Sequence, residues 1–518
     1  MTIAEAMALA SGHLQAGRLD QAEEIFRAIL AKQADNAYAL NYLGVILAKR
    51  GQESEAASLM RRSVASNPPV AHLYTNLAGV LLSIRDMAGA ETAARAGLAL
   101  EPNMAQGRLD LGNALWAQGK LEEAVAEFQK GVETDPRRWD IYGALGLCLG
   151  ELGRIDESLN ALQKVVELEP RRATNLATLG NAQLSAGRVE QAIENCRKAV
   201  ELVPNEPGAH YNLAIALLTA GNWTAGWEEY EWRLQDLRLT PEPRAYMQPA
   251  WDGSSPQGKT LLLYTEESPA DAIMFARYIP SLAEQGAKVI LECQPELMEL
   301  LRSVPGVDQV FARGEMLPEF DFHLPLGSLP KIFGTTPQNV PAPGTYLHPP
   351  EDRIEAARQR IVQQAGDAKL KVGISWVASN RPAQQWRNLG IQSLATLGEV
   401  AGVRWYNLGP VSAAKHTLGG AEIVDLFRSF RDFADVAAAV ANLDLVITAD
   451  TMVPHIAGAM GEEVWLLLPF ASDWRWLRDR DDTPWYPTMR LFRQPTPGDW
   501  GTAVSHVIEI LNQRGFAG

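Results

Sequence analysis

The sequence is poor in the features that mark secreted, membrane-spanning and zinc-binding proteins. Its 518 residues include three cysteines, Cys148, Cys196 and Cys293, whose spacing fits neither a disulfide framework nor a zinc site. It has no apolar run of about 18 residues, which a membrane-spanning helix would need. The N-terminal segment, MTIAEAMALASG, lacks the basic cluster that begins a secretory signal. We therefore expect a cytoplasmic protein without a membrane span.

An excess of basic residues is also missing. The 47 lysines and arginines are outnumbered by 62 aspartates and glutamates, and the formal net charge is −15. Nucleic-acid binding needs a basic face, so the charge argues against that function. The acidic run Asp479–Asp482 is interpreted as solvated surface rather than as a metal-binding motif. No metal and no cofactor are expected.

In its first half the sequence repeats with a period of 34 residues. A leucine recurs at this interval, a small residue follows it 13 positions later, and proline closes most repeats. Paired antiparallel helices explain the pattern, because small residues let two helices pack closely and proline ends the second helix. The pattern resembles the tetratricopeptide repeat and predicts a protein-binding solenoid over residues 1–240. The seven units are 3–36, 37–70, 71–104, 105–138, 139–172, 173–206 and 207–240, and the leucines are Leu43, Leu77, Leu111, Leu145, Leu179 and Leu213.

Four asparagines fall on the first helices of their units, near the side expected to line the groove of the solenoid. They are Asn76, Asn113, Asn181 and Asn212. An asparagine side chain can hold a peptide backbone with its donor and its acceptor together. In the O-GlcNAc transferases a ladder of such asparagines holds an extended peptide. The alternative is that asparagine is simply common in the consensus of this repeat.

An aromatic segment, NWTAGWEEYEWR, ends the repeats and contains Trp223, Trp227 and Trp232. We interpret these rings as packing the last repeat against the next domain, which predicts a rigid junction. Stacking on a nucleotide base is the alternative. The following segment, 241–257, is rich in proline, glycine and serine and is predicted to be a linker.

The second half alternates predicted strands and helices, which is typical of parallel sheets in an α/β fold. We expect two Rossmann-like halves, a reduced one over 258–348 and a second over 349–518. Within the first, PADAIMFARYIPSLAEQG (269–286) is predicted to be one helix. The two halves with a cleft between them are compatible with the GT-B architecture of glycosyltransferases.

The stretch Leu443–Trp476 predicts the floor of a ligand site. LDLVIT is an apolar run typical of a strand buried on both faces. Asp450 and Thr451 end this strand and cap a short helix from Met452 to about Met460. Ligands of open α/β sheets lie where strands end and helices begin, and the N–H groups of a helix start suit a phosphate. We interpret this turn as part of a nucleotide-sugar site.

Several runs resemble bacterial tetratricopeptide-repeat glycosyltransferases, which are related to the ADP-heptose:lipopolysaccharide heptosyltransferases. The motifs are D-T-x-x-x-H-x-A-G at 450–458 and D-W-R-W at 473–476, with LLLYTEESPADAIMFARYIPSLAEQGAKVILECQPEL and VGISWVAS. The resemblance covers nearly the whole chain. It implies a metal-independent, inverting GT-B enzyme that glycosylates a protein. Some proteins of this architecture glycosylate flagellin, which their repeats recruit.

The resemblance also implies donor-binding residues, each of which has a structural alternative. Asp450 and Thr451 could be helix caps, His455 and Trp376 could be core residues, and Trp474 could pack rather than stack on a base. Arg387 matches a family arginine that could neutralise a diphosphate, although SNRPAQQWRN departs from the family loop. The donor-binding set is Trp376, Arg387, Asp450, Thr451, Met452, His455, Asp473 and Trp474.

The catalytic base expected from the family is the aspartate of a G-L-G-D loop after the first strand. Here Ser268-Pro269-Ala270-Asp271 stands in its place, so both glycines are lost and proline restricts the loop. Asp271 is the first candidate for the base and Glu266 the second. The alternative is that they are carboxylates favoured near a helix N-terminus.

We therefore expect a glycosyltransferase that moves a sugar from a nucleotide-sugar to serine or threonine of a protein such as flagellin. The alternative is a non-catalytic repeat scaffold with a degenerate transferase domain, suggested by the altered loops. A lipopolysaccharide sugar transferase is a third hypothesis, but a glycolipid acceptor needs no peptide groove. An oligomer is compatible with the repeats.

Overall fold

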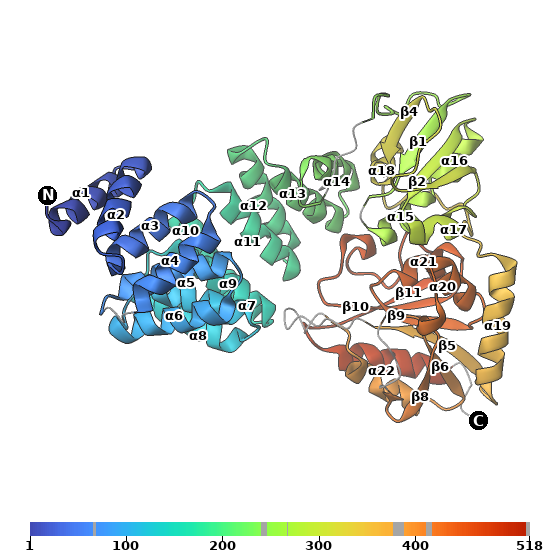
Figure 1. The fold of residues 1–518 in the computed structure, drawn as a ribbon. Helices are drawn as coiled ribbons and strands as arrows, with labels where there is room; N and C mark the ends of the chain where they lie inside the picture. Colours follow the sequence, from blue (N-terminus) through green and yellow to red (C-terminus); the bar gives the residue numbers. More distant parts are fainter. Residues whose placement is uncertain (66–68, 240–245, 267, 377–387, 411–416, 514–518) are drawn as a thin grey trace. The chain divides into compact units, whose positions relative to one another are not determined.

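The structure of the chain is a computed structural model that describes residues 1–65, 69–239, 246–266, 268–376, 388–410 and 417–513 (Figure 1). These residues fold into two compact units, of which the first is Met1–Pro170 and the second begins at Arg171. The predicted solenoid is therefore divided. Its first five repeats form unit 1, whereas the sixth and seventh belong to unit 2 together with the α/β part.

Unit 1 consists of helix pairs, one pair in each of the first five predicted repeats. Small residues lie where paired helices cross: a Cβ on Gly112 would approach the Phe128 ring to 2.3 Å, and one on Gly44 would approach Met60 to 2.8 Å. The pairs are α1 (Ile3–Gln15) with α2 (Leu19–Lys32), α3 (Ala37–Lys49) with α4 (Glu53–Ala65), α5 (Ala71–Ser83) with α6 (Met87–Leu100), α7 (Ala105–Ala117) with α8 (Leu121–Thr134), and α9 (Trp139–Glu151) with α10 (Ile155–Leu168).

The turn within each pair repeats the 34-residue period in the backbone. In four of the five pairs of unit 1 the turn contains a glycine with φ between 72° and 77°. Glycine adopts this left-handed conformation without the steric cost of a Cβ. Arg85 takes the equivalent position in the third pair with φ of 61°, so that turn carries a strain the others lack.

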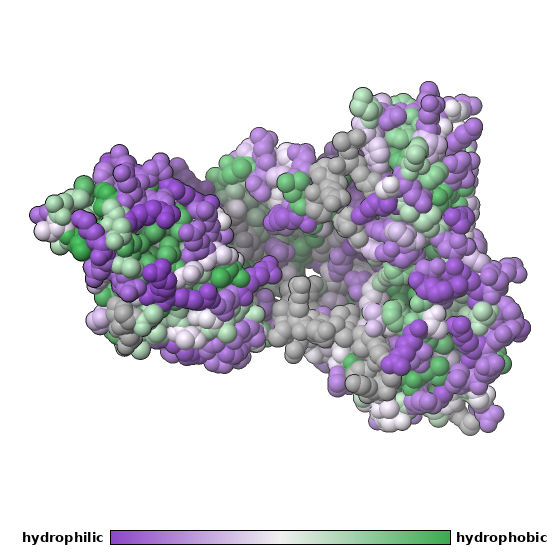
Figure 2. Space-filling view, in the orientation of Figure 1, coloured by the Kyte–Doolittle hydropathy of each residue, from purple (hydrophilic) through white to green (hydrophobic). Residues whose placement is uncertain are grey.

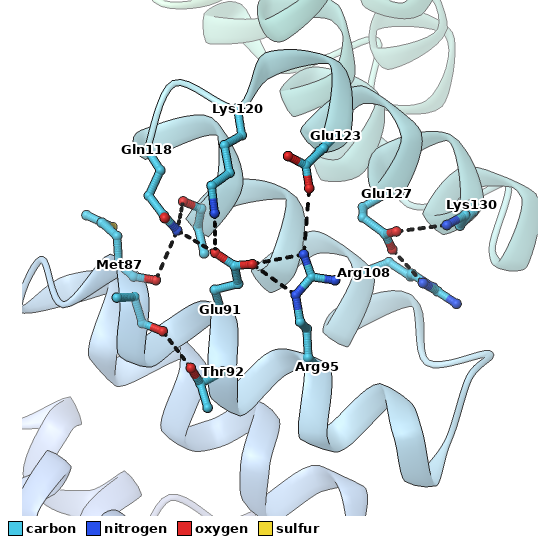
Figure 3. A network of polar contacts seen from close by, with 12 residues as sticks. Met87, Glu91, Thr92, Arg95, Arg108, Gln118, Lys120, Glu123, Glu127 and Lys130 are labelled. Atoms are coloured by element: carbon cyan, nitrogen blue, oxygen red, sulfur yellow. Dashed lines mark hydrogen bonds and ion pairs between the residues drawn. The ribbon is translucent and has the colours of Figure 1, made fainter.

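Polar contacts join the third and fourth repeats. The carboxylate of Glu91 on α6 accepts hydrogen bonds from Arg95 Nε at 2.9 Å, Gln118 Nε2 at 2.9 Å and Lys120 Nζ at 2.8 Å (Figure 3). The bond from Lys120 and that from Gln118 are the main causes that lower the pKa of Glu91 to about 2.

Hydrophilic side chains cover most of the visible surface, with hydrophobic ones scattered among them (Figure 2), as is usual for folded chains.

Unit 2 begins with two more helix pairs and the 3-10 turn that follows them. Trp223 and Trp227 are 1% and 2% exposed, and their rings share one core with Trp474 and Trp485 of the second α/β half. The interpretation of these tryptophans as packing residues is confirmed, and the shared core explains why the last repeats belong to unit 2. The elements are α11 (Ala173–Ser185), α12 (Val189–Leu202), α13 (Pro207–Thr219), α14 (Trp223–Tyr230) and η1 (Glu231–Gln235).

Trp232, the third tryptophan of the junction, has a different neighbour. Its ring stacks on His210 of α13 with the centroids 3.9 Å apart. His210 Nδ1 is in turn 2.5 Å from a carboxylate oxygen of Glu229. These contacts stabilise the seventh repeat internally.

The first α/β half contains a four-stranded parallel sheet in the order β3-β2-β1-β4. The end of the predicted linker also belongs to it, because Trp251 is buried and its N–H donates to His323 O at 2.9 Å beside β4. The elements are β1 (Thr260–Tyr264), α15 (Pro269–Ala276), α16 (Ile279–Glu284), β2 (Lys288–Cys293), η2 (Pro295–Leu297), α17 (Met298–Leu301), β3 (Val307–Ala312), β4 (Phe322–Pro325), η3 (Leu326–Ser328) and α18 (Leu329–Ile332).

The second half contains a sheet in the order β11-β10-β9-β5-β6-β8-β7, in which the described pairs are parallel except β7 with β8. The elements are α19 (Glu351–Ala365), β5 (Leu370–Ser375), η4 (Ile391–Glu399), β6 (Val403–Asn407), β7 (Thr417–Leu418), β8 (Ala421–Asp425), η6 (Phe427–Ser429), α20 (Phe433–Val440), β9 (Leu445–Ala449), α21 (Val453–Ala459), β10 (Val464–Leu468), η7 (Trp474–Trp476), β11 (Met489–Arg493) and α22 (Trp500–Leu511).

Both faces of this second sheet are covered. Val446 and Leu466 pack in the core that contains α20 and α21, whereas Ile447 and Leu467 pack in the core that contains α22. Successive residues of a strand point to opposite faces, so a strand covered on both sides is apolar throughout. This is why the sequence shows unbroken apolar runs at β9 and β10.

Two details differ from the predicted elements. The single helix expected over 269–286 is wrong, since the chain forms α15 and α16 with a break at Arg277 and Tyr278. Pro280 has no N–H to continue the helical hydrogen bonds across this break. The strands β8 and β11 were not predicted, because each is short and gives little periodic signal.

Candidate functional site

The second sheet has a point where connections leave in opposite directions. From β5 the chain leads to β6 on one side, and from β9 it leads to β10 on the other. In open α/β sheets, ligands bind at the carboxyl ends of the strands at such a point. Ser375 and Thr448, near those ends, are register partners and fully buried. The Ser375 hydroxyl has no hydrogen-bond partner among the residues that the structure describes.

The turn after β9 carries Asp450 and Thr451 at this edge of the sheet. The Asp450 carboxylate accepts a hydrogen bond from Trp476 Nε1 at 2.8 Å. Thr451 Oγ1 accepts one from the Val453 N–H at 3.3 Å in the turn before α21, whose N-cap residue is Met452. Both side chains are only partly buried. The predicted helix cap is wrong for both residues, because α21 has no side-chain cap, and donor binding stays a prediction.

His455 lies inside α21 and is 1% exposed. Its Nδ1 is 3.0 Å from the Tyr486 hydroxyl, and its ring lies against Trp476. Burial, together with the charges of Arg475 and Arg277, lowers the pKa of His455 well below its ordinary value. The imidazole is therefore neutral near pH 7. It packs against Trp476, the residue that donates to Asp450 in the turn.

Three other predicted donor residues lie mainly in the core. Trp376 and Trp474 are 3% and 2% exposed, and Met452 packs against the core that contains α21. Such burial leaves little ring surface for a nucleotide base, which favours the packing interpretation of both tryptophans. Arg387 lies outside the described residues.

The candidate base Asp271 is part of an ion pair that the sequence did not predict. Arg475 of η7 donates to the Asp271 carboxylate from Nη2 and to Asp473 Oδ1 from Nη1, the latter at 2.6 Å. Asp473 also caps η7 by accepting from the Arg475 N–H. Burial raises the pKa of Asp271 above its ordinary value, and the Arg475 cation opposes this effect. One arginine thus connects α15 of the first half with η7 of the second.

Glu266, the second candidate base, is also paired. Arg233 of η1 donates to its two carboxylate oxygens, from Nε at 2.7 Å and from Nη2 at 3.0 Å. Arg233 is 3% exposed and also donates to Ser328 Oγ at 3.0 Å. Glu266 follows β1 and Ser328 follows β4, the two strands at which the order of the first sheet reverses. The last repeat therefore places an arginine at the switch point of that sheet.

The predicted asparagine ladder has different surroundings in each unit. In unit 1, Asn76 donates from Nδ2 to Asn41 Oδ1 at 2.7 Å, and the buried Asn41 donates to Leu73 O at 3.0 Å. Asn113 is partly buried on α7. In unit 2, Asn181 is exposed on α11, and Asn212 Nδ2 lies 3.5 Å from Ala177 O. One amide hydrogen of Asn76 is therefore already used inside the protein.

Asn76 lines a groove of about 440 Å³ between α3, α5 and α7. Asp110 of α7 lines the same groove and was not predicted. It is 4% exposed, accepts from Gln106 Nε2 at 2.8 Å through Oδ1, and leaves Oδ2 without a partner among the described residues. Burial raises the pKa of Asp110 to about 7. The spacing of Gln106, Asp110 and Asn113 places them on one face of α7, and this pattern could have indicated a polar groove from the sequence.

Two general findings concern metals and membranes. Within the described ranges, no three histidine, cysteine, aspartate or glutamate side chains lie close enough together to hold a metal ion. No helix of the described chain is long and apolar enough to cross a membrane.

Comparison with known families identifies the repeats. A tetratricopeptide-repeat model matches residues 7–71, 75–138 and 109–174, and a TPR-repeat model matches residues 180–221. The chain therefore contains tetratricopeptide repeats, which indicate a protein-interaction module. Protein FlbA of Caulobacter vibrioides is 28% identical over 334 residues, which are 59% of this chain and 54% of FlbA. The chain spans about half the length of this curated relative.

Solved structures with matching repeats cover part of the chain. A protein of the APC/C hetero-tetramer Cut9-Hcn1 matches with a TM-score of 0.37 and 17% identity, covering 42% of this chain and 43% of its own. A thermophilic TPR protein of Thermus thermophilus matches with a TM-score of 0.31 and 25% identity, covering 35% and 99%. MamA of Desulfovibrio magneticus RS-1 matches with a TM-score of 0.31 and 21% identity, covering 33% and 97%.

Proposed function

We propose that the chain is a glycosyltransferase of GT-B type whose repeats bind a protein and whose α/β part transfers a sugar to it. The donor is a nucleotide-sugar and the acceptor is a serine or threonine of the bound protein, with flagellin as the first acceptor to test. The observation that carries the proposal is the polar edge where β5 and β9 diverge. Ser375 ends β5 there, and Asp450 and Thr451 follow β9, at the place where open α/β sheets bind nucleotides.

The proposed reaction is a single displacement. The acceptor hydroxyl oxygen attacks the anomeric carbon, the bond from that carbon to the phosphate oxygen breaks, and the nucleoside diphosphate leaves. The hydroxyl proton passes to Asp271, the first candidate base, and Thr451 with the neighbouring N–H groups stabilises the departing phosphate charge. Asp271 accepts this proton only when Arg475 moves away from its carboxylate. The proposal involves no metal, so transfer should persist in the presence of a chelator.

A second function, a non-catalytic scaffold, is favoured by one specific observation. Both carboxylates considered as the base are held by buried arginines, Asp271 by Arg475 and Glu266 by Arg233. A carboxylate held in this way is a poorer proton acceptor than an unpaired one. In the scaffold the repeats bind the partner and these ion pairs only stabilise unit 2.

The first experiment is thermal unfolding of the full chain with UDP, GDP, ADP, CMP and their common sugars. A ligand at about 100 times its Kd adds about 2.7 kcal/mol to the stability of the unit that binds it. A shift with one base supports the donor site, and Thr451→Val should then reduce the shift. Arg387→Ala is the second variant, because that residue has a family counterpart.

The second experiment measures transfer itself. The chain is incubated with flagellin and with the donor that shifted its unfolding temperature, and the mass of flagellin is recorded. An increase by the mass of one sugar supports the enzyme if this increase is absent with Asp271→Asn. A donor-dependent shift without any mass increase contradicts the flagellin assignment. The absence of both a nucleotide shift and transfer overturns the enzyme in favour of the scaffold.

A further inference from the structure

The groove between α3, α5 and α7 contains an acceptor that the protein itself does not satisfy. Asp110 Oδ2 is inaccessible to bulk solvent on a side chain that is 4% exposed, and it has no hydrogen-bond partner in the described part of the chain. A buried polar atom without a partner destabilises the fold, and more strongly if it is charged. Such an atom in the wall of a groove is suited to a ligand that supplies a donor.

The charged and polar groups near the groove do not donate a hydrogen bond to Asp110 Oδ2. Gln106 of the same helix donates to Oδ1, the other oxygen of Asp110. Arg138, before α9, lowers the pKa of Asp110 by its charge, but its guanidinium donates to Asp140 and to Gln106 Oε1. Lys49 and Glu53 line the groove from α3 and α4. None of these groups donates to Asp110 Oδ2 in the described part of the chain, which leaves this oxygen open to a donor from a ligand.

The wall that accompanies Asp110 is partly apolar. Val45 and Ala48 of α3 and Val80 of α5 line the groove, while Thr75 and Asn76 provide its polar side. Lysine and arginine lay their methylene stems along apolar surface and extend the cationic group beyond it. An apolar wall next to an unpaired carboxylate matches both parts of such a side chain.

We propose that this groove takes up a lysine or arginine side chain of an extended segment of the protein partner. The methylene groups lie on Val45, Ala48 and Val80, and the cationic group donates to Asp110 Oδ2 once the neighbouring side chains move to expose this atom. The inference rests on the proposed function of the repeats as the protein-binding part, and it adds the chemical class of the residue that they recognise. The raised pKa of Asp110 agrees with it, because a bound cation would favour the charged carboxylate.

The groove offers a blocking variant that is independent of Asp110. A Cβ on Gly79 of α5, which lines the groove, would have no atom within 4 Å. Gly79→Trp should therefore place an indole ring at the groove from a position where the Cβ meets no atom, and it also removes a glycine from a helix interior. For the charge, Glu133→Gln on α8 is the matched control, because this exposed glutamate is outside the groove.

The test selects peptides from a random dodecapeptide phage library on the full chain. Wild type should enrich peptides with lysine or arginine at one position, and Gly79→Trp should retain none of them. The best peptide is then measured by fluorescence anisotropy against wild type, Asp110→Asn and Glu133→Gln. Asp110→Asn should weaken it by about tenfold or more, since a hydrogen bond to a charged group contributes about 1.5–3 kcal/mol. Norleucine in place of the basic residue should weaken it equally in wild type and have little effect in Asp110→Asn.

The outcomes separate the subsite from the groove. Circular dichroism first confirms that each variant keeps its helices. One outcome is a selected peptide that loses binding to Gly79→Trp and still binds Asp110→Asn as tightly as wild type. This result would refute the lysine or arginine subsite and leave the groove as the binding surface. Failure to select any peptide that Gly79→Trp abolishes would overturn the subsite and remove the groove of unit 1 from the proposed function. A nucleotide-dependent shift in the unfolding experiment would still support the α/β part.

Discussion

Arg475 donates a hydrogen bond to the carboxylate of Asp271 and thereby joins the two α/β halves of unit 2. The two side chains are 14% and 18% exposed, so the pair is largely shielded from water. In sequence the residues are separated by 204 positions. The pair is therefore one of the contacts between the two halves, and it occupies the carboxylate of Asp271.

Replacing Arg475 by methionine should destabilise unit 2 by about 3 kcal/mol, because it leaves a buried carboxylate without its cation. Adding Asp271→Asn to this variant should recover part of the loss. Urea unfolding of the single and double variants measures the coupling. Arg478→Met is the control: its partner Glu190 is 74% exposed, so the change should cost at most about 1 kcal/mol. Equal losses of unfolding free energy in Arg475→Met and Arg478→Met would show that the Asp271 pair stabilises unit 2 no more than an exposed ion pair does.

Gly327 is expected to be essential for the contact between Arg233 and Glu266. A Cβ on Gly327 would lie 2.4 Å from Glu266 Oε2 and 2.9 Å from Arg233 Nη2. Gly327→Ala should therefore displace the ion pair and lower the stability of unit 2 by about 1–3 kcal/mol. Gly501→Ala on α22, where the nearest atom is 3.7 Å away, should cost nothing measurable. A wild-type urea midpoint for Gly327→Ala would contradict the tight packing described for this site.

Arg85→Gly should stabilise unit 1 by about 0.5–1 kcal/mol. The residue has φ of 61°, a conformation that glycine adopts without the Cβ penalty, although glycine also gains entropy in the unfolded chain. Arg85→Ala retains the strained Cβ and serves as the control. The midpoints of urea unfolding should rise only for the glycine variant, and an equal rise for alanine would show that the arginine side chain was responsible.

His455 should make unit 2 less stable as the pH falls. Its pKa in the folded state lies well below the ordinary value near 6.5, so below pH 6.5 the unfolded chain binds a proton that the folded chain does not. The loss should approach about 1.4 kcal/mol for each further pH unit. His455→Gln should flatten the dependence of the unfolding free energy between pH 7.5 and 5, whereas His506→Gln, at an exposed position of α22, should not. An unchanged slope in His455→Gln would contradict a neutral buried imidazole.

Asp110 should make unit 1 less stable as the pH rises. Its pKa is raised from an ordinary 3.8 to about 7, so between these values the folded chain holds a proton that the unfolded chain has lost. Stability should therefore fall as the pH rises from about 4 to about 7. Asp110→Asn should stabilise unit 1 by about 2–4 kcal/mol at pH 8 and by much less at pH 4. Glu133→Gln should change neither value, and an equally small effect of Asp110→Asn at both pH values would exclude a strained carboxylate.

The repeats and the buried strands were predictable from the order of the amino acids alone. The 34-residue period predicted the helix pairs, because leucine, a small residue and proline act within one hairpin of the chain. The apolar runs predicted β9 and β10 because a strand covered on both faces has no polar side. The turn with Asp450 and Thr451 was predicted where it lies, but α21 has Met452 as its N-cap residue and no side-chain cap. The strand β8 was missed because it has little periodic signal, whereas the break between α15 and α16 was missed although Pro280 is a local signal for it.

Contacts between residues that are far apart in the sequence became visible only in the folded chain. Nothing in the local pattern pairs Arg233 with Glu266 or Arg475 with Asp271, since these contacts depend on how separate elements pack. The aromatic core around Trp223 assigned the last repeats to unit 2, where the sequence suggested one continuous solenoid. Asp110 likewise gained its burial and its unsatisfied oxygen from neighbours on other helices. Periodicity is encoded within one element, whereas charge pairing and desolvation arise only when elements from distant parts of the sequence pack together.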